Sequence, residues 1–455
     1  MRSTLFLILR TPGHARSAIP AALSCAPLPH APSPTVTAHA APRQAALIFI
    51  FVTVALDILA IGLIIPVLPP LIAGFFPNPA EGAAMYGWFV TVFALMQFLA
   101  SPLLGALSDR FGRRPVILLS NLGLGLDYIL MALAQTLPLL FLGRIIGGIT
   151  SASIATANAY IADVTPPEKR AASFGMLGAA FGLGFVVGPA VGGLLGSVDP
   201  RLPFWVAAAL SLLNFLYGYF VLPESLPAGR HHRFEWKRAN PIGSLLWLKQ
   251  FPQVFGLATA SFLSVLAHVV FPATFVLYAA HRYSWSERDI GFTLAFVGVL
   301  SALVQAVLVR RVIPLIGERR ALLTGFGFAV LGFIGYAWAP TGTWLWTVMP
   351  LLALWGLAGP SLQSLMTRQI DPTEQGRLQG AVASLGAVAG VIGPYVFTHI
   401  YAAGIDPARG WNLPGVAFYL AAALVAMALL IGHLATRLRV PSPRTRGEGG
   451  AAGDG

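Results

Sequence analysis

Charged residues are scarce in this sequence of 455 residues. Asp, Glu, Lys and Arg make up only 10% of the chain, whereas a soluble protein has about 25%. So few charges cannot cover a globule of this size, which excludes an ordinary soluble protein. Intrinsic disorder is also excluded, because 56% of the residues are hydrophobic. The sequence has a single cysteine, Cys25, which excludes an intrachain disulfide framework and a cysteine-based metal cluster.

Long apolar stretches take the place of the missing charges. About 20 apolar residues are needed to cross the hydrocarbon layer as a helix, and a backbone in lipid must satisfy its own hydrogen bonds. Twelve such stretches predict an all-α integral membrane protein. They cover residues 46–73, 84–107, 115–135, 137–160, 171–196, 203–222, 252–280, 289–312, 320–338, 343–367, 378–403 and 412–435.

The net charge of +12 is best interpreted by the side of the membrane on which the basic residues fall. With the N-terminus inside, 24 of the 29 Lys and Arg residues lie on the cytoplasmic side. The positive-inside rule therefore predicts that both termini are cytoplasmic. We expect a multi-pass protein of a bacterial-type inner membrane, with the lipid bilayer and not nucleic acid as its partner.

A polar stretch at residues 223–251 divides the chain into two groups of six helices, residues 46–222 and 252–435. Its apolar part, residues 241–249, is expected to lie along the membrane surface. Residues 1–45 are interpreted as a disordered tail or a misassigned start, and residues 436–455 as a disordered cytoplasmic tail. The His231–His232 pair has no third ligand nearby and is interpreted as solvated loop.

The two groups of helices are related. Gly112, Gly175, Gly188 and Pro189 recur 205 residues later as Gly317, Gly380, Gly393 and Pro394. Each pair falls at the same place in its group. Two pseudo-symmetric six-helix bundles are typical of alternating-access transporters, with the substrate site between them.

The loop after the second stretch reads GALSDRFGRRP from Gly105 to Pro115. A tight turn favours glycine, and the charges can pair or cap a neighbouring helix end. This loop resembles the G-x-L-x-D-R-x-G-R-[RK] motif of the major facilitator superfamily. We expect a cytoplasmic gate in which Arg113 meets Asp163 and Asp109 faces the start of the eleventh stretch. These contacts are expected to hold the outward-open state and to break when the inward side opens. The full gate set is Asp109, Arg110, Gly112, Arg113 and Asp163.

The fifth stretch carries a glycine pattern at spacings that allow close helix crossing. Its residues are Gly175, Gly184, Gly188, Pro189, Gly192 and Gly193. The pattern resembles the motif of the superfamily's drug/proton antiporters. That resemblance implies export instead of uptake, while the glycine face also packs and Pro189 allows bending.

Within the antiporters, the chain from Gln44 to Thr436 resembles the tetracycline/proton exporters most. The similarity includes Leu56-Asp57, the run Gly62 to Pro69, Leu126-Asp127-Tyr128 and Leu142-Gly143-Arg144. The resemblance implies transport roles for Asp57, Asp109, Arg113, Asp127, Arg144 and Gln305. Two positions depart from that family, because Ser301 replaces its histidine and Ala329 its aspartate.

Ionisable residues inside the apolar stretches are few. Asp57, Asp127 and Arg144 are expected to couple protons, because a charge at that depth is costly unless it has a partner or a function. A purely structural Asp127–Arg144 ion pair is the alternative. His268, with Gln305, is a candidate for the substrate cavity, although a lone buried histidine is more often a hydrogen-bonded core residue.

The sequence therefore predicts a monomeric, proton-driven antiporter that exports hydrophobic or amphipathic drug-like molecules. A proton-linked importer of a small nutrient and a non-transporting receptor are the alternatives. We find no nucleophile–base pair, phosphate loop or metal site, so neither an enzyme nor a cofactor is expected. Since Ser301 and Ala329 remove charge from the second half, we expect lipophilic neutral or monocationic substrates, with tetracycline a poor one.

Overall fold

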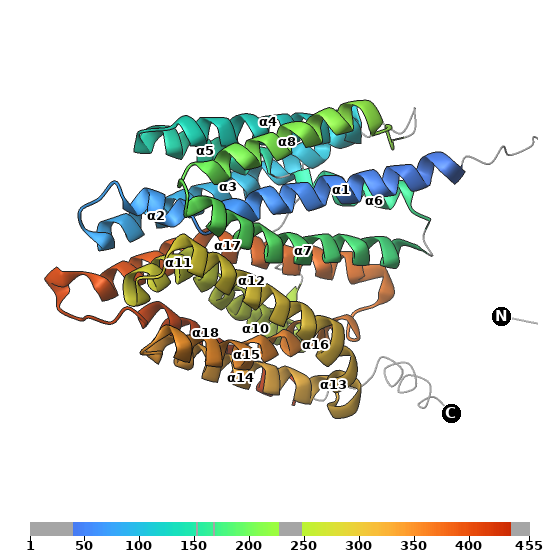
Figure 1. Ribbon diagram of the computed structural model, residues 1–455. Coiled ribbons are helices and arrows are strands. Elements are labelled where there is room, and N and C mark those ends of the chain that lie inside the picture. Colours follow the sequence, from blue (N-terminus) through green and yellow to red (C-terminus); the bar gives the residue numbers. More distant parts are fainter. Residues whose placement is uncertain (1–39, 152, 167–168, 227–247, 438–455) are drawn as a thin grey trace, which may run out of the picture. The chain divides into compact units, whose positions relative to one another are not determined.

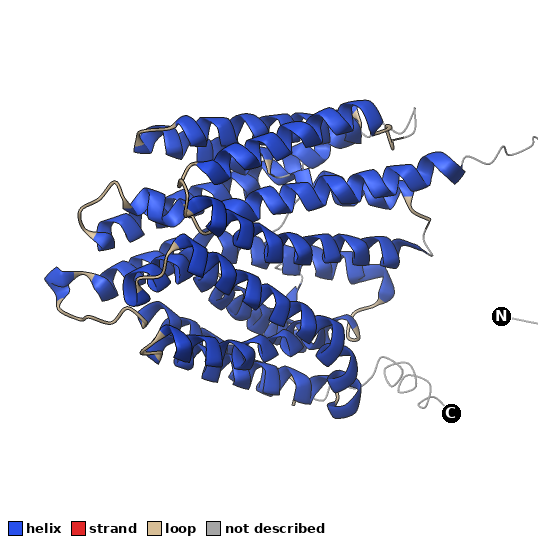
Figure 2. Ribbon diagram, viewed as in Figure 1, coloured by secondary structure: helices blue, strands red, loops and turns tan. Residues whose placement is uncertain are grey.

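The computed structural model describes residues 40–151, 153–166, 169–226 and 248–437. Every regular element in these ranges is a helix, and none is a strand (Figure 2). Residues 42–455 form one unit, and the contacts between helices lie within it. The two predicted tails and the predicted surface segment 241–249 lie largely outside the described residues.

The first half contains eight helices in its described residues (Figure 1). They are α1 (Ala40–Ile64), α2 (Leu68–Ala73), α3 (Pro79–Phe111), α4 (Arg113–Leu133), α5 (Leu137–Thr150), α6 (Ser153–Val164), α7 (Arg170–Gly196) and α8 (Leu202–Val221). In the second half, the helices are α10 (Pro252–His268), α11 (Val270–Tyr283), α12 (Glu287–Leu303), α13 (Val309–Ile316), α14 (Glu318–Trp338), α15 (Gly342–Ala353), α16 (Ala358–Thr367), α17 (Gln375–Ile405) and α18 (Val416–Ala435). A π-helical turn, Val304–Leu308, joins α12 to α13.

Eleven spans in the described residues are long and apolar enough to cross a membrane. They correspond to eleven of the twelve predicted stretches. The remaining stretch, 137–160, forms the shorter apolar helix α5 followed by α6, so the single helix expected there is interrupted after Thr150. The first stretch is also interrupted, between α1 and α2, where Pro66 has no backbone N–H to continue the helix. The chain is therefore a multi-pass membrane protein.

Helices of each half pack on one another, and two helix pairs make the most extensive contacts between the halves. Within the first half, α4 packs on α8 and α3 on α5; within the second, α10 and α14 both pack on α18. Between the halves, α7 packs on α12 and α3 on α17. One buried apolar cluster contains residues of both halves, including Phe89 of α3 and Phe397 of α17.

The glycines of α7 show that this packing is uneven along the bundle. We call the end that carries Gly112 and Gly317 the motif end, and the opposite end the far end. A Cβ placed on Gly193, near the far end, would lie 3.0 Å from the Cα of Gly291 in α12. A Cβ on Gly178, near the motif end, would meet none of the described atoms of other elements within 4 Å. The halves are thus closed against each other at the far end and separated at the motif end.

Candidate functional site

A buried ion pair joins α4 to α5. Nη2 of Arg144 lies 3.7 Å from Oδ2 of Asp127, and these residues are only 8% and 1% exposed. The glycines on either side of Arg144 make this approach possible, because a Cβ on Gly147 would lie 2.6 Å from Oδ2 of Asp127 and one on Gly143 2.9 Å from Oδ1. The Arg144 guanidinium also lies over the ring of Phe93, 5.3 Å from its centroid. The structure therefore brings two of the three predicted coupling residues together.

The ion pair lies in the wall of a cavity of about 130 Å³. Most of its lining is apolar: Ile61, Ile64, Ile65, Leu68, Tyr86, Val90, Phe93, Leu124, Asp127, Tyr128, Arg144, Ser151 and Pro272. Tyr86 also reaches across to the second half, where its hydroxyl donates to the carbonyl oxygen of Pro272 at 3.1 Å. An apolar wall with a few convergent polar groups is the usual composition of a small-molecule site.

Asp57, the third predicted coupling residue, is buried beside α8 and is absent from the cavity lining. Nδ2 of Asn214 donates to Oδ1 of Asp57 at 3.2 Å and to the carbonyl oxygen of Thr53 at 3.1 Å. Sequence reasoning missed Asn214. Its signal was a lone amide side chain within the apolar stretch 203–222.

The gate loop is held within the first half. Arg113 lies between two carboxylates, with Nη1 2.5 Å from Asp109 and Nε 3.2 Å from Asp163. Asp109 was expected to face the start of α17, but it pairs with Arg113 and its side chain is 46% exposed. The N-cap residue of α17, Glu374, makes no side-chain capping hydrogen bond in the described part of the chain. The contact with α17 was expected for the outward-open state, and here the two halves are separated at this end. Arg110 lies over the ring of Phe111 at 5.2 Å.

Glu224, which follows α8, contacts the predicted gate loop, and the sequence did not reveal this contact. Its carboxylate accepts from the backbone N–H groups of Arg113 at 2.9 Å and Arg114 at 3.2 Å. It therefore caps the positive N-terminal end of α4. Gly112 has a φ of +104°, and a Cβ at this position would collide with the Glu224 carboxylate. The glycine is needed for both reasons.

The second half repeats the loop-to-helix ion pair with its charges reversed. Glu318 and Arg368 stand 205 residues after Arg113 and Asp163, and Nη2 of Arg368 lies 2.6 Å from Oε1 of Glu318. Gly317 has a φ of +80°, as the repeat of Gly112 requires. The internal repeat therefore extends from sequence to geometry.

The glycine pattern of α7 forms a close crossing with α1. A Cβ on Gly188 would lie 2.7 Å from the Cα of Gly62. Gly184 faces Ile58, and Gly192 faces the backbone of Leu63. Pro189 lies inside the helix next to this crossing. Gly175 is nearer the motif end, and a Cβ placed on it would have none of the described atoms of other elements within 4 Å.

The predicted residues of the second half do not join this site. Gln305 is exposed on the π-helical turn. His268 is exposed at the end of α10, with its ring 5.5 Å from that of Trp355. Ser301 is exposed, whereas Ala329 is fully buried.

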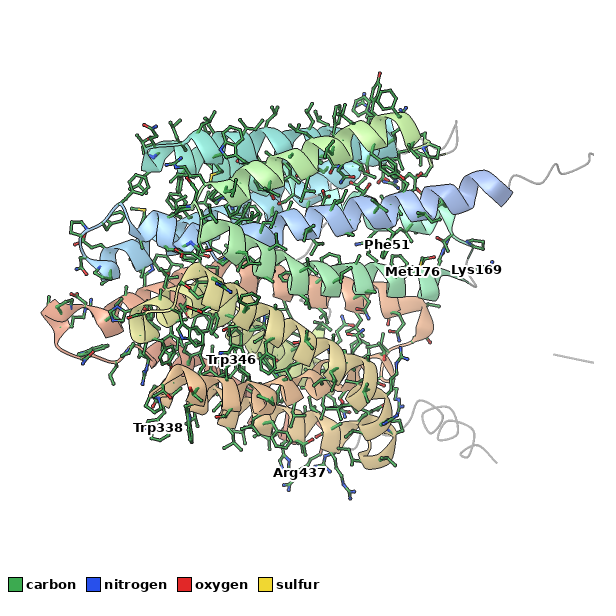
Figure 3. All side chains as sticks on the ribbon, viewed as in Figure 1. Phe51, Lys169, Met176, Trp338, Trp346 and Arg437 are labelled. Atoms are coloured by element: carbon green, nitrogen blue, oxygen red, sulfur yellow. The ribbon has the colours of Figure 1, made fainter. Side chains whose placement is uncertain are left out.

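The described residues offer no metal site, and a second, smaller pocket lies apart from the cavity. No cluster of three or more His, Cys, Asp or Glu in the described residues could hold a metal ion. A pocket of about 10 Å³ near the motif end is lined by Phe51 and Met176, labelled in Figure 3. It is large enough for about one water molecule.

Comparison with known proteins gives one consistent picture. The Major Facilitator Superfamily profile matches residues 50–394. "Tetracycline resistance protein, class C" of Escherichia coli is 42% identical over 384 residues, which is 84% of this chain and 95% of that protein. "Tetracycline resistance protein, class D" of Salmonella ordonez is 39% identical, covering 83% of this chain and 94% of that protein.

Two solved structures share the fold. The human organic anion transporter MFSD10 (TETRAN) matches with a TM-score of 0.64 and 24% identity, over 86% of this chain and 99% of that chain. A bacterial homolog to the human lysosomal transporter Spinster, in an inward-facing and unoccupied conformation, matches with a TM-score of 0.72 and 17% identity, over 88% and 98% of the two chains.

Proposed function

This chain belongs to the Major Facilitator Superfamily, and we propose that it exports lipophilic drugs in exchange for protons. The observation that carries the proposal is the Asp127–Arg144 pair in the wall of an apolar cavity. The apolar and aromatic lining accepts a lipophilic molecule, and the pair supplies a carboxyl group that can take up and release a proton. Similarity to tetracycline resistance proteins over most of the chain supports export.

Proton coupling depends on two opposing effects on Asp127. Burial disfavours its charged form, and the Arg144 guanidinium group favours it. A buried carboxylate is costly when it stands alone, and a cation beside it offsets that cost. A substrate that enters the cavity, or a movement of α4 against α5, changes the separation of Asp127 from Arg144. Proton binding at Asp127 and Asp57 thereby alternates with substrate binding.

Alternating access follows from the uneven packing of the two halves. With the motif end in the cytoplasm, the structure is an inward-open state, closed at the far end by the glycine contacts of α7. In the outward-open state the motif ends meet, and Asp109 turns from Arg113 to the N-terminal end of α17, where the helix dipole favours a carboxylate. The protein works in the inner membrane as a monomer with both termini in the cytoplasm, and the proton gradient replaces any cofactor.

Proton release on substrate addition tests this function. Inverted membrane vesicles carrying the full chain are acidified inside, and a lipophilic cationic dye is added outside. We expect dye uptake into the vesicles together with proton efflux, and we expect Asp127→Asn to abolish both uphill dye uptake and proton release. Dye uptake that is indifferent to the pH gradient would contradict proton exchange.

The same vesicles test the substrate class. Ser301 and Ala329 leave the second half without two ionisable groups of the tetracycline exporters, and losing one carboxylate removes an attraction of about 4 kcal/mol for a cation at an effective dielectric of ~20. We expect the dye to be taken up and tetracycline with Mg²⁺ to be taken up poorly. Strong proton-dependent tetracycline uptake without dye uptake would show that the substrate is the chelate instead.

A further inference from the structure

Tyr128 lies near both buried carboxyl groups, which themselves lie in different surroundings. It follows Asp127 on α4, is only 3% exposed and lines the same cavity. Its side chain interacts electrostatically with Asp127, with Arg144 and also with Asp57. Asp57 is absent from the cavity lining, so Tyr128 is a lining residue with both carboxyl groups in its electrostatic surroundings.

Helix geometry explains this placement. Gly125, one turn before Tyr128, faces α8, because a Cβ there would lie 2.7 Å from Cδ2 of Leu212. The two helices run antiparallel, so Asn214 lies about five residue rises, roughly 7 Å, closer to the motif end than Tyr128. Helical side chains lean toward the N-terminus of their own helix, which for α4 is the motif end. The tyrosine side chain therefore extends toward the level of Asn214 and of Asp57, which Asn214 binds.

Several groups along this line lack a hydrogen-bond partner among the described residues. In the part of the chain that the structure describes, no hydrogen bond involves the Tyr128 hydroxyl, whereas the Tyr86 hydroxyl in the same cavity is bound to Pro272. Both carboxylate oxygens of Asp127 and Oδ1 of Asn214 also lack a hydrogen-bond partner among the described residues. Buried polar groups are almost always hydrogen-bonded to protein or water, and a cavity of about 130 Å³ accommodates several water molecules.

We propose that the Tyr128 hydroxyl relays the coupling proton between Asp127 and Asp57, directly or through one water molecule. Protonated Asp127 gives its proton to the hydroxyl oxygen while the hydroxyl proton passes to the Asp57 carboxylate. Tyr128 ends as neutral as it began, Asp127 becomes a carboxylate opposite Arg144, and Asp57 becomes a neutral acid beside Asn214. The concerted step avoids a buried tyrosinate, which would be costly.

Tyr128→Phe tests the relay, because it removes the hydroxyl and keeps the ring. The variant is compared with wild type in the inverted vesicles, once for uphill dye uptake driven by the pH gradient and once for dye exchange without a gradient. We expect uphill uptake to fall about a hundredfold, the lower end of the range for a lost acid–base group, while exchange stays at the wild-type rate. Tyr217→Phe is the matched control, because Tyr217 is exposed on α8 and does not line the cavity, and it should leave both rates unchanged.

The outcomes separate the relay from the proposed function on which it rests. Uphill uptake at the wild-type rate in Tyr128→Phe would refute the relay while proton exchange stands. Loss of both exchange and uphill uptake, with normal membrane abundance, would also refute it, because Tyr128 would then hold the substrate. If wild type shows no dye-dependent proton release, the proposed function itself fails.

Discussion

Replacing Arg144 by leucine tests the charge pair on which the proposed mechanism depends. At the observed separation of 3.7 Å, two unit charges attract by about 4 kcal/mol at an effective dielectric of ~20. Removing one partner of a buried pair costs about 3–5 kcal/mol, because the other charge is left uncompensated. We therefore expect Arg144→Leu to lose up to this free energy of unfolding. The lone Asp127 can limit the loss by keeping its proton, but a carboxyl group that keeps its proton cannot couple transport.

A second variant separates stability from coupling. Asp127→Asn combined with Arg144→Leu removes both charges, so most of the lost stability should return. Uphill export should stay absent, because no carboxyl group is left at this site. Thermal unfolding of the purified proteins in detergent measures the first effect, and dye uptake into vesicles measures the second. Arg288→Leu at the exposed far end is the control, and it should change stability by less than about 0.5 kcal/mol.

Two results would refute this reasoning. Uphill export at the wild-type rate by Arg144→Leu would show that the guanidinium group is not needed for coupling. A double variant no more stable than Arg144→Leu would show that the loss came from packing against Phe93 and not from an uncompensated charge.

Three further predictions concern the gate and the helix crossing. Asp109→Asn should reduce dye export at unchanged membrane abundance on an immunoblot; export at the wild-type rate would remove Asp109 from the gate. Glu318→Lys and Arg368→Glu should each lower the thermal unfolding temperature slightly, since the exposed arginine limits the ion pair to about 1 kcal/mol. The double variant should restore the wild-type unfolding temperature, whereas additive losses would argue against the pair. Gly188→Val should reduce the yield of folded protein on size-exclusion chromatography, because overpacking against Gly62 costs about 1–3 kcal/mol of stability. Gly178→Val should fold normally, and equal yields of the two variants would contradict the close crossing.

The parts of this fold that depend on local pattern could be predicted from the sequence. Hydropathy located the spans, because each helix must satisfy its backbone within the bilayer. The glycine at 112 and its repeat at 317 predicted tight turns, and both positions have positive φ. Asp127 and Arg144 were paired because their depths in adjacent helices matched, and the structure brings them together.

Contacts between distant segments could not be predicted in this way. Glu224 caps α4 from 111 residues away, and Asn214 binds Asp57 across 157 residues. Neither residue belongs to a local motif, so only the packing of α8 on α4 and α1 reveals its role. The contact expected between Asp109 and α17 belongs to the outward-open state, and a motif does not state which of two conformations the chain adopts.

Among the described residues, the buried polar side-chain atoms that lack a hydrogen-bond partner lie in one of the two halves. All of these atoms belong to the first half, between Thr53 and Asn214. The second half instead contributes an aromatic cluster around Phe271, whose ring contacts those of Phe333 and Phe418. Internal water can complete the hydrogen bonds of buried polar groups, whereas packed aromatic rings exclude water. In the proposed mechanism, proton binding therefore belongs to the first half, and the second half is the apolar partner that moves against it.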